Sequence, residues 1–411
     1  MDKIKVLWFS NTPAAGDEFI SSNGTGGWLK SLDKALQDKI DLHVAFNDRH
    51  YPEEFTVGKT TYHQIAPYGK LKLIKRKVFQ RYNRNTDLPK YLDLINKVKP
   101  DLIHIHGTEQ SFVQLTKYTD IPVLLSIQAI LTVMNHKYYS GISKNDLPLY
   151  ANSFIKSYNR FTKQAQIERE NLPYVKYVMG RTDWDRRVYS VLAPQAKYYV
   201  SNEVLRDSFY TRTWVEPKRN DNKIILHTTT GGLLFKGFET LCLALQQLIR
   251  VGLNVEWRVA GLSENHKLVK VVKKKLGKDY PQKGLVLFGS LSEADLIERM
   301  LESSVFVYPT HQDNSSNALC EAMILGIPCV STFAGGSGTM LKDGEEGIMV
   351  QDGDPWAMAG AVIELITNRE KALIYGQNAR KKALVRHSKD SIVDSVMEVY
   401  EEIVSEENGG K

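Results

Sequence analysis

Cysteine is scarce in this chain of 411 residues, which contains only Cys242, Cys320 and Cys329. Three cysteines are too few for a framework of disulfides, and their spacing matches no zinc signature, so a reducing compartment is indicated. Long apolar runs are also missing, because no stretch reaches the roughly eighteen residues that a membrane-spanning helix needs.

A secretion signal is not expected either. The N-terminus, MDKIKVLWFS, is basic and then apolar, but its apolar part is only about six residues long. Asn11, Thr12 and Pro13 follow it, so this segment is interpreted as a first buried strand. We therefore expect a cytoplasmic protein.

The dinucleotide fingerprint G-x-G-x-x-G is absent from the glycine-rich run SSNGTGGWLKSL. Gly24 and Gly26 would supply its first two glycines, but the third position is Leu29. A dinucleotide-dependent enzyme is therefore disfavoured.

The composition is that of a soluble globular protein, with 42% hydrophobic and 25% charged residues. The chain carries 54 Lys and Arg against 47 Asp and Glu, a net charge of +7. Its length exceeds what one hydrophobic core usually serves, so two domains are expected.

Short β-branched apolar runs alternate with helical patterns along the whole chain. Because these runs are apolar throughout, they are typical of strands covered on both faces, and the alternation predicts βαβ units with parallel sheets. The predicted strands are residues 4–9, 42–46, 102–105, 123–127, 174–179, 224–227, 255–260, 285–288, 305–308 and 328–332.

A polar stretch with Pro217 interrupts this rhythm, and we place the domain linker there, at residues 213–222. The predicted domains are residues 1–212 and 223–387. A last amphipathic helix over residues 388–411 could cap the second domain or cross back to the first.

The strongest chemical signal is HQDNSSNALCEAMILGIPCVS. A strand ending at Tyr308 leads through a polar loop into a helix over Asn317–Leu325, capped by Ser315 or Ser316 and stopped by Gly326. The N-terminus of a helix offers unpaired N–H groups and partial positive charge, which favour phosphate.

Two carboxylates accompany this helix. Glu321 lies about one turn into it, and Asp313 lies eight positions earlier, in the loop. A carboxylate can accept two hydrogen bonds from vicinal hydroxyls such as those of ribose. An ordinary strand–loop–helix connection with a capping serine is the alternative interpretation.

This pattern resembles the acid-x7-acid signature of the retaining GT-B glycosyltransferases grouped as glycosyltransferase family 4, and EAMILGIP is close to that family's usual sequence. The resemblance implies that Glu321 holds the ribose of a nucleotide. It also implies that Asp313, where the family usually has Glu, lies near the transferred sugar. Further donor contacts are implied at the start of the helix: Ser316, Asn317 and Ala318.

A second signal, TTTGGLLFKGFETL, places a Thr/Gly loop between a strand and a helix. Gly232 permits close approach of the backbone, and Lys236 brings a positive charge to a phosphate. A flexible loop with a solvated lysine is the alternative. The family commonly has Arg and Lys here on the donor diphosphate; Lys236 matches the Lys, but Gly231 stands at the Arg position.

Two glycine loops complete the resemblance. Gly26 and Gly27 resemble the family's N-terminal Gly-Gly loop, which approaches the donor phosphates and the acceptor. Gly335 and Gly336, in AGGSGTMLKDGEEGIMV, resemble glycines beside the donor sugar and are predicted to offer a backbone platform. Structural turns are the alternative for both loops.

Polar residues follow two predicted strands of the first half. His104 and His106 share one face of a strand. They could be a metal pair, but no third ligand is evident. His104 is therefore interpreted as a satisfied core or cleft histidine, and His106, with Glu109 nearby, as a candidate for the active site. At the end of VLLSIQAI many family members carry an active-site His, and this chain has Gln128. Its amide cannot titrate but can hydrogen-bond a sugar or a phosphate.

Residues 70–84 contain seven Lys and Arg and no acid, interleaved with apolar residues. Such a segment can bind an anionic membrane surface, which would place the protein at the inner face of a membrane, or form a solvated helix face. An aromatic stripe at Tyr150, Phe154, Tyr158 and Phe161 has helical spacing, which is more typical of a core than of an acceptor groove. No nucleic-acid module is recognisable, so nucleic acid is not an expected partner.

The expected architecture is GT-B, an α/β fold with two Rossmann-like domains facing each other across a cleft. The implied function is retaining transfer of a sugar from a nucleotide diphosphate, a UDP-sugar, to a saccharide or lipid-linked acceptor in cell-surface polysaccharide or glycolipid biosynthesis. Asp313, Lys236, Gln128 and His106 are the candidate catalytic residues, and neither a metal nor a cofactor is expected.

Two other functions stay open. A nucleotide-sugar epimerase of similar architecture would need acid–base residues around the sugar, and no convincing set is visible. A catalytically silent subunit that only binds the donor would agree with Gly231 and Gln128.

Overall fold

The structure is a computed structural model that describes residues 3–20, 27–48, 50–65, 87–217 and 223–409. They form two compact units, the first of Met1–Asn135, Asn159–Arg206 and His387–Lys411, the second of His136–Tyr158 and Asp207–Arg386. The expected N-terminal domain, residues 1–212, includes residues 136–158, but these pack with the second unit. Among the described residues, no helix is both long and apolar enough to cross a membrane.

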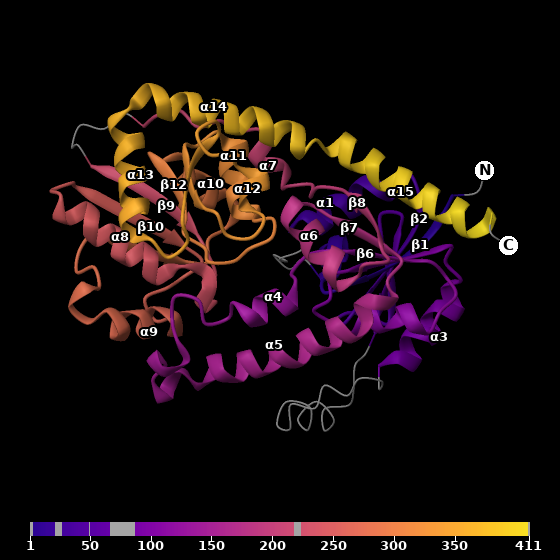
Figure 1. Ribbon diagram of the computed structural model, residues 1–411. Coiled ribbons are helices and arrows are strands. Elements are labelled where there is room, and N and C mark those ends of the chain that lie inside the picture. Colours follow the sequence, from indigo (N-terminus) through magenta and orange to yellow (C-terminus); the bar gives the residue numbers. More distant parts are fainter. Residues whose placement is uncertain (1–2, 21–26, 49, 66–86, 218–222, 410–411) are drawn as a thin grey trace. The chain divides into compact units, whose positions relative to one another are not determined.

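The first unit contains a sheet in the order β3-β4-β2-β1-β5-β6-β7-β8 (Figure 1). All neighbouring strands are parallel except β3 and β4, which form an antiparallel hairpin at one edge. Its strands are β1 (Lys5–Ser10), β2 (Asp41–Phe46), β3 (Glu54–Val57), β4 (Thr60–Gln64), β5 (Leu102–His106), β6 (Val123–Ser126), β7 (Tyr177–Gly180) and β8 (Lys197–Val200).

Helices cover both faces of this sheet. Alternate residues of β1 point to opposite faces, with Val6 and Trp8 in one core cluster and Leu7 and Phe9 in the other. The helices assigned to the first unit, in whole or in part, are η1 (Ala14–Ile20), α1 (Gly27–Leu36), α3 (Leu88–Val98), η2 (Ser111–Lys117), α4 (Leu131–His136), α5 (Asn152–Asn171), η5 (Leu172–Tyr174), α6 (Asp183–Leu192) and α15 (Lys389–Gly409).

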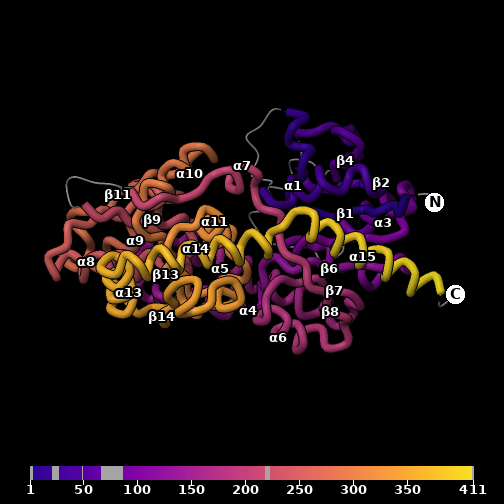
Figure 2. The backbone as a smooth tube through the Cα atoms, turned by 90° about the horizontal axis from the view of Figure 1, so that it is seen from above, coloured from indigo at the N-terminus to yellow at the C-terminus, as the bar shows by residue number. Residues whose placement is uncertain are grey.

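Helix α15 packs with the first unit, beside α1 and β5 (Figure 2). Its Tyr400 hydroxyl accepts from Trp8 Nε1 at 3.0 Å and lies 2.6 Å from Nδ1 of His104. The other ring nitrogen of His104 lies 2.6 Å from the Ser126 hydroxyl. Burial and the charge of Arg181 lower the pKa of His104 to about 3. Of the two predicted places for a satisfied histidine, the core and the cleft, the structure shows the core.

The second unit contains a parallel sheet in the order β11-β10-β9-β12-β13-β14. Its strands are β9 (Ile224–Thr229), β10 (Val255–Ala260), β11 (Leu285–Gly289), β12 (Val305–Tyr308), β13 (Cys329–Thr332) and β14 (Gly347–Val350). A buried hydrogen-bond chain links three of them, because Trp257 Nε1 donates to the Thr228 hydroxyl, which donates to the Val307 carbonyl.

The helices of the second unit begin with two short turns in the segment 136–158 and end with α14 beside α11. They are η3 (Lys144–Asp146), η4 (Leu149–Ala151), α7 (Asp207–Tyr210), η6 (Leu234–Lys236), α8 (Phe238–Arg250), α9 (Lys267–Leu276), η7 (Gly277–Asp279), α10 (Glu293–Leu301), α11 (Asn317–Leu325), α12 (Ser337–Met340), α13 (Pro355–Thr367) and α14 (Arg369–Arg386).

The strand order locates a switch point in each sheet, where consecutive strands depart in opposite directions. It lies between β1 and β5 in the first unit and between β9 and β12 in the second. Ligands of parallel sheets bind outside the carboxyl ends of the strands at such a point. The predicted α/β class with parallel sheets is confirmed. A site is therefore expected at the carboxyl edge of each sheet, beside its switch point.

Candidate functional site

An ion pair lies at the switch point of the second sheet. Lys236 ends η6, and its Nζ lies 2.7 Å from Oδ2 of Asp313, in the loop between β12 and α11. The Tyr308 hydroxyl donates to the same carboxylate oxygen and lies 3.5 Å from Lys236 Nζ. Burial alone would lower the pKa of Lys236, but Asp313 and Tyr308 raise it, so the ammonium group stays charged.

The glycine loop after β13 holds the backbone of Asp313. Gly335 has a φ of +55°, and a Cβ atom built there would lie 1.7 Å from the Asp313 carbonyl oxygen. The N–H of Gly336 donates to that same oxygen at 3.0 Å. A side chain at position 335 would therefore displace the loop that carries the Asp313 carboxylate.

Helix α11 begins three residues after Asn314, next to this loop. The hydroxyl of Ser316 accepts from the Leu319 N–H at 3.4 Å, so Ser316 is the capping residue and Ser315 is not. Asn317 and Ala318 form the start of the first turn, and both are half-buried. Glu321, one turn further, is 5% exposed.

The loop after β9 contains both glycines of the second sequence signal. A Cβ atom built on Gly231 would meet no atom within 4 Å in the part of the chain that the structure describes, whereas one on Gly232 would lie 2.2 Å from Cε1 of His266. His266 caps α9 by accepting from the Leu268 N–H through Nδ1 at 3.2 Å. Its Nε2 therefore carries the ring proton when the imidazole is neutral.

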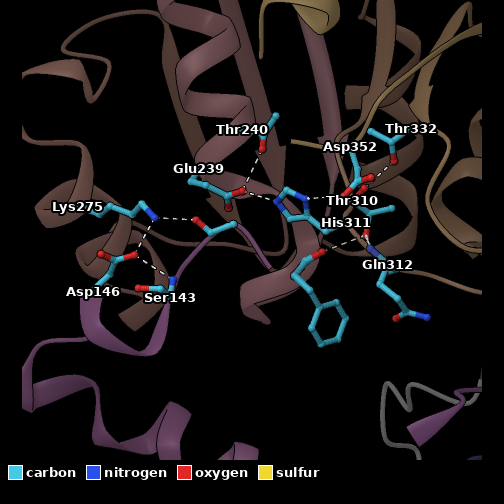
Figure 3. A network of polar contacts seen from close by, with 12 residues as sticks. Ser143, Asp146, Glu239, Thr240, Lys275, Thr310, His311, Gln312, Thr332 and Asp352 are labelled. Atoms are coloured by element: carbon cyan, nitrogen blue, oxygen red, sulfur yellow. Dashed lines mark hydrogen bonds and ion pairs between the residues drawn. The ribbon is translucent and has the colours of Figure 1, made fainter. Parts of the chain in front are cut away.

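A buried network supports the loop between β12 and α11 from the other side (Figure 3). His311 Nε2 lies 2.5 Å from Oε1 of Glu239, at the start of α8, and His311 Nδ1 lies 3.3 Å from Oδ2 of Asp352. Burial opposes the charged imidazolium, but the two carboxylates raise the pKa of His311. The same pair lies against Gly141, where a Cβ atom would be 2.1 Å from Glu239 Oε1.

In the first unit, His106 ends β5 at the switch point. It is fully buried, and its ring centroid lies 4.5 Å from that of Trp8 and 5.8 Å from that of Trp28. Neither ring nitrogen has a hydrogen-bond partner among the residues that the structure describes. Burial, then the charges of His104 and Arg181, hold the pKa of His106 well below its usual value, so the ring is neutral.

Glu109 lies at the same edge of the first sheet, three residues after His106, with which the sequence already grouped it. Its carboxylate accepts from Asn11 Nδ2 at 3.1 Å and from the Ala129 N–H at 3.3 Å. Burial raises the pKa of Glu109 to about 7, against the effect of these donors. The half-buried Gln128 directly precedes Ala129, so both candidates belong to neighbouring loops.

The predicted residues thus fall into two sets. The contacts join Lys236, Asp313, Gly335 and Gly336 in the second unit, and His106 and Gln128 lie at strand ends of the first. Gly27 is the first residue of α1 and has a φ of +39°. Gly26 and the basic segment 70–84 lie outside the described residues.

Sequence reasoning missed Tyr308, Glu239 and His311. In the sequence, Tyr308 was interpreted only as the last residue of a strand. Its hydroxyl group, at the end of that strand, is the signal that could have predicted a polar contact. Glu239 follows Lys236 within the run KGFE and looked like an ordinary acid in a first helical turn.

Comparison with known families identifies one match. Residues 224–368 match the sequence profile of the family described as Glycosyl transferases group 1. The capsular polysaccharide biosynthesis glycosyltransferase CapM of Staphylococcus aureus is 26% identical over 52% of this chain and 53% of its own length. The N-acetyl-alpha-D-glucosaminyl L-malate synthase of Bacillus anthracis is 26% identical over 31% of this chain and 33% of its own. The matches therefore span about half or less of these relatives.

Solved structures resemble nearly the whole chain. A sucrose-phosphate synthase from Thermosynechococcus elongatus superposes with a TM-score of 0.74 at 14% identity, over 98% of this chain and 100% of that one. HepE of Anabaena, in complex with UDP-glucose, gives 0.66 at 14% identity, over 97% and 100%. The second unit therefore carries a domain of the Glycosyl transferases group 1 family, in a chain whose fold is GT-B.

Proposed function

We propose that this chain is a retaining glycosyltransferase of family 4. It moves a sugar from a UDP-sugar to a saccharide or lipid-linked acceptor, in the biosynthesis of a cell-surface polysaccharide or glycolipid. The observation that carries the proposal is the contact between Lys236 and Asp313, 2.7 Å apart, at the switch point of a domain whose residues 224–368 match the Glycosyl transferases group 1 family. CapM, named for capsular polysaccharide biosynthesis, and HepE, seen with UDP-glucose, support the acceptor class and the donor class.

In this proposal the donor lies along the carboxyl edge of the second sheet. Lys236 and the N–H groups at the start of α11, in Asn317 and Ala318, bind the diphosphate. Glu321 accepts hydrogen bonds from the ribose hydroxyls, and Asp313 contacts the sugar. The Gly335–Gly336 backbone fixes the position of the loop that carries Asp313, because the Gly336 N–H donates to the Asp313 carbonyl.

In this proposal the Lys236–Asp313 ion pair separates when the donor binds. Asp313 neutralises Lys236 when no phosphate is near. An incoming diphosphate offers two negative groups and competes for the ammonium group, which frees the Asp313 carboxylate to turn toward a sugar hydroxyl. Lys236 would then bind the diphosphate while Asp313 contacts the sugar, as the resemblance to the family implies.

The chemistry is a substitution at the anomeric carbon with retention. The bond from that carbon to the diphosphate oxygen breaks, the bond to the acceptor oxygen forms on the same face, and the acceptor proton passes to the departing diphosphate. The protein's task is to stabilise the leaving charge with Lys236 and backbone N–H groups. Neither a metal nor a cofactor is part of this proposal.

His106, Gln128 and Glu109 are the proposed acceptor-side groups. His106 ends β5, and Glu109 and Gln128 lie in the loops that follow β5 and β6 at the carboxyl edge of the first sheet; the two nitrogens of His106 have no partner among the described residues. An imidazole beside Trp28, an amide and a carboxyl group suit the hydroxyls and the apolar face of a sugar.

A thermal-shift screen with nucleotide sugars tests the donor class, since a ligand that binds the native state raises the melting temperature. We expect stabilisation by at least one UDP-sugar. Glu321→Ala should then weaken donor binding by about 1.5–3 kcal/mol, because charge-assisted hydrogen bonds to the ribose are lost. Isothermal titration measures this loss.

The control for Glu321→Ala is Glu364→Ala, which removes an exposed carboxylate paired with Lys371 in the same unit. Its donor affinity should equal that of the parent. Unchanged affinity of Glu321→Ala, with the control behaving as expected, would remove Glu321 from the ribose site.

A catalytically silent donor-binding subunit is the second candidate, and Gly231 favours it. No side chain fills the family's Arg position here, since a Cβ atom on Gly231 would meet none of the described residues within 4 Å. Donor binding of ordinary strength, without transfer to acceptor extracts and without slow donor hydrolysis, would support that candidate. Formation of an epimer without acceptor would instead indicate the third function, an epimerase.

A further inference from the structure

Helix α9 has one apolar and one strongly basic face. Its buried face consists of Leu268, Val269, Val271 and Val272. The remaining positions carry exposed lysines, which are Lys267, Lys270, Lys273, Lys274 and Lys275, and Lys278 follows in η7. Since residues three and four apart lie on one side of a helix, Lys267, Lys270 and Lys274 form a row.

The segment 141–153 lies directly beside this row, within the second unit. The Tyr150 hydroxyl donates to the Lys270 carbonyl at 3.2 Å, and Lys267 Nζ donates to the Ser153 hydroxyl at 3.4 Å. At the other end of α9, Lys275 Nζ donates to the Gly141 carbonyl and to Asp146, each at 2.8 Å (Figure 3). These bonds fix the turn η4 against the basic helix.

The turn η4 presents apolar side chains to solvent. Leu149 is 98% exposed and Tyr150 is 52% exposed, although both belong to an ordered turn that is tied to α9. A leucine so exposed gains nothing in folding, and together with Tyr150 and the adjacent lysines it leaves an amphipathic surface available for a contact. We call Leu149, Tyr150, Lys267, Lys270 and Lys274 the lysine face.

The charge around these residues is positive. Two of the nearby acids are already paired, Asp146 with Lys275 and Asp279 with Arg250. Glu264 is the exposed acid just before the helix. The row of lysines therefore meets little opposing charge on its own surface.

We propose that the lysine face binds an anionic lipid bilayer. Leu149 and Tyr150 enter the boundary between headgroups and acyl chains, where aliphatic and amphipathic aromatic side chains are favoured. The lysines contact the headgroups, each contributing through the negative surface potential of the membrane. A nucleic acid fits less well, because a lone protruding leucine offers no surface on which bases stack.

This surface differs from the basic segment 70–84 and does not depend on donor binding. The test is co-sedimentation with vesicles of phosphatidylglycerol and phosphatidylcholine at low salt. The parent should bind these vesicles and not pure phosphatidylcholine. Combining Leu149→Ser with Lys270→Gln and Lys274→Gln should lower the partition coefficient about tenfold or more. An unchanged melting temperature shows that this variant is folded.

The matched control likewise removes one apolar side chain and two lysines, from another helix of the same unit: Val385→Ser with Lys381→Gln and Lys382→Gln on α14. Val385 is 74% exposed and Lys381 is exposed, so loss of charge and apolar surface is comparable, and binding should stay within about twofold of the parent. Equal losses in both variants would overturn the proposal, as would failure of the parent to bind or unaltered binding of the lysine-face variant. Binding to RNA but not to vesicles would assign the face to nucleic acid instead.

Discussion

At the scale of single residues, Gly231 stands where the family that this chain resembles commonly has Arg. Apart from its chain neighbours, no described residue lies within 4 Å of a Cβ atom built there. The adjacent Gly232 is different, because His266 occupies the space beside it. A neutral His266 can donate one hydrogen bond through Nε2 but brings no charge, since burial and then Lys267 lower its pKa.

Gly231→Arg should therefore tighten donor binding. A guanidinium beside the diphosphate adds charge-assisted hydrogen bonds, for which we expect about 1.5–3 kcal/mol. Donor titration of the purified variant measures this gain. Gly232→Arg is the matched control, because its side chain would collide with His266 and should lower stability without raising affinity. Equal donor affinity of the parent and Gly231→Arg would place the diphosphate elsewhere.

Glu109 gives a residue-scale prediction about pH. Its pKa rises from 4.5 to about 7 in the native state, mainly through burial. The native state therefore binds the proton more tightly than the unfolded state, and the contribution of Glu109 to stability falls as pH rises from 4.5 to 7. Relative to Glu109→Gln, the parent should lose up to about 3 kcal/mol of unfolding free energy across this window.

Urea denaturation of both proteins at pH 5 and pH 8 measures that difference. Other titrating groups are common to both proteins and cancel in the comparison. A constant difference between the two proteins at these pH values would mean that the Glu109 carboxyl is not perturbed.

At the scale of elements, the predicted strands agree with the structure where both faces of a strand are covered. The runs at 255–260 and 305–308 coincide with β10 and β12, and most others differ by one or two residues. The hairpin β3–β4 was missed because its sequence, EFTVGKTTYHQ, alternates polar and apolar residues at a sheet edge. The half-exposed edge strand β8 was missed for the same reason.

The network of His311 joins three elements, because its partners lie at the start of α8 and before α13. Its raised pKa means that its stabilising effect is fully present below the unfolded value of 6.5 and is lost as pH rises through the folded value. Glu239→Gln should therefore lower the unfolding free energy more at pH 6 than at pH 9, by about 3 kcal/mol at the lower pH.

Glu364→Gln serves as the control for this network, since its partner Lys371 does not titrate between pH 6 and pH 9. Denaturant midpoints at the two pH values give the comparison. A penalty for Glu239→Gln that does not change with pH would show that His311 is neutral at both.

At the scale of the whole molecule, sequence reasoning found the two-unit organisation but not the path of the chain between the units. The segment His136–Tyr158 packs with the second unit, and no local pattern could predict this. Helical spacing of the aromatic stripe correctly indicated burial for Phe154 and Phe161, at 7% and 8% exposure, but was wrong for Tyr150, which is 52% exposed. Periodicity identifies a buried face but not the partner that buries it.

The same limit applies to the candidate site. Motif spacing predicted Asp313, Lys236 and the capping serine, because these lie in short loops beside strands. The Lys236–Asp313 pair spans 77 positions, and His311 meets Asp352 across 41. Such contacts depend on strand order, which a single sequence does not specify.

The proposal predicts where a donor changes hydrogen exchange. Saturating UDP-sugar should slow exchange of amides in residues 229–237 and 313–321, which flank the switch point of the second sheet. The buried strands β5 and β6 of the first unit serve as an internal reference and should exchange as without ligand. Protection confined to the first unit would contradict the donor site.

The position of helix α15 also bears on how this protein is made. Tyr400 and Ile403 belong to the same core cluster as Val6 and Trp8 of the first strand. On the ribosome, the earliest strands emerge long before their last packing partner, and an entire second unit is translated in between. The strands of the first unit therefore remain incompletely packed until α15 has been synthesised. During that interval they most need the protection of a chaperone.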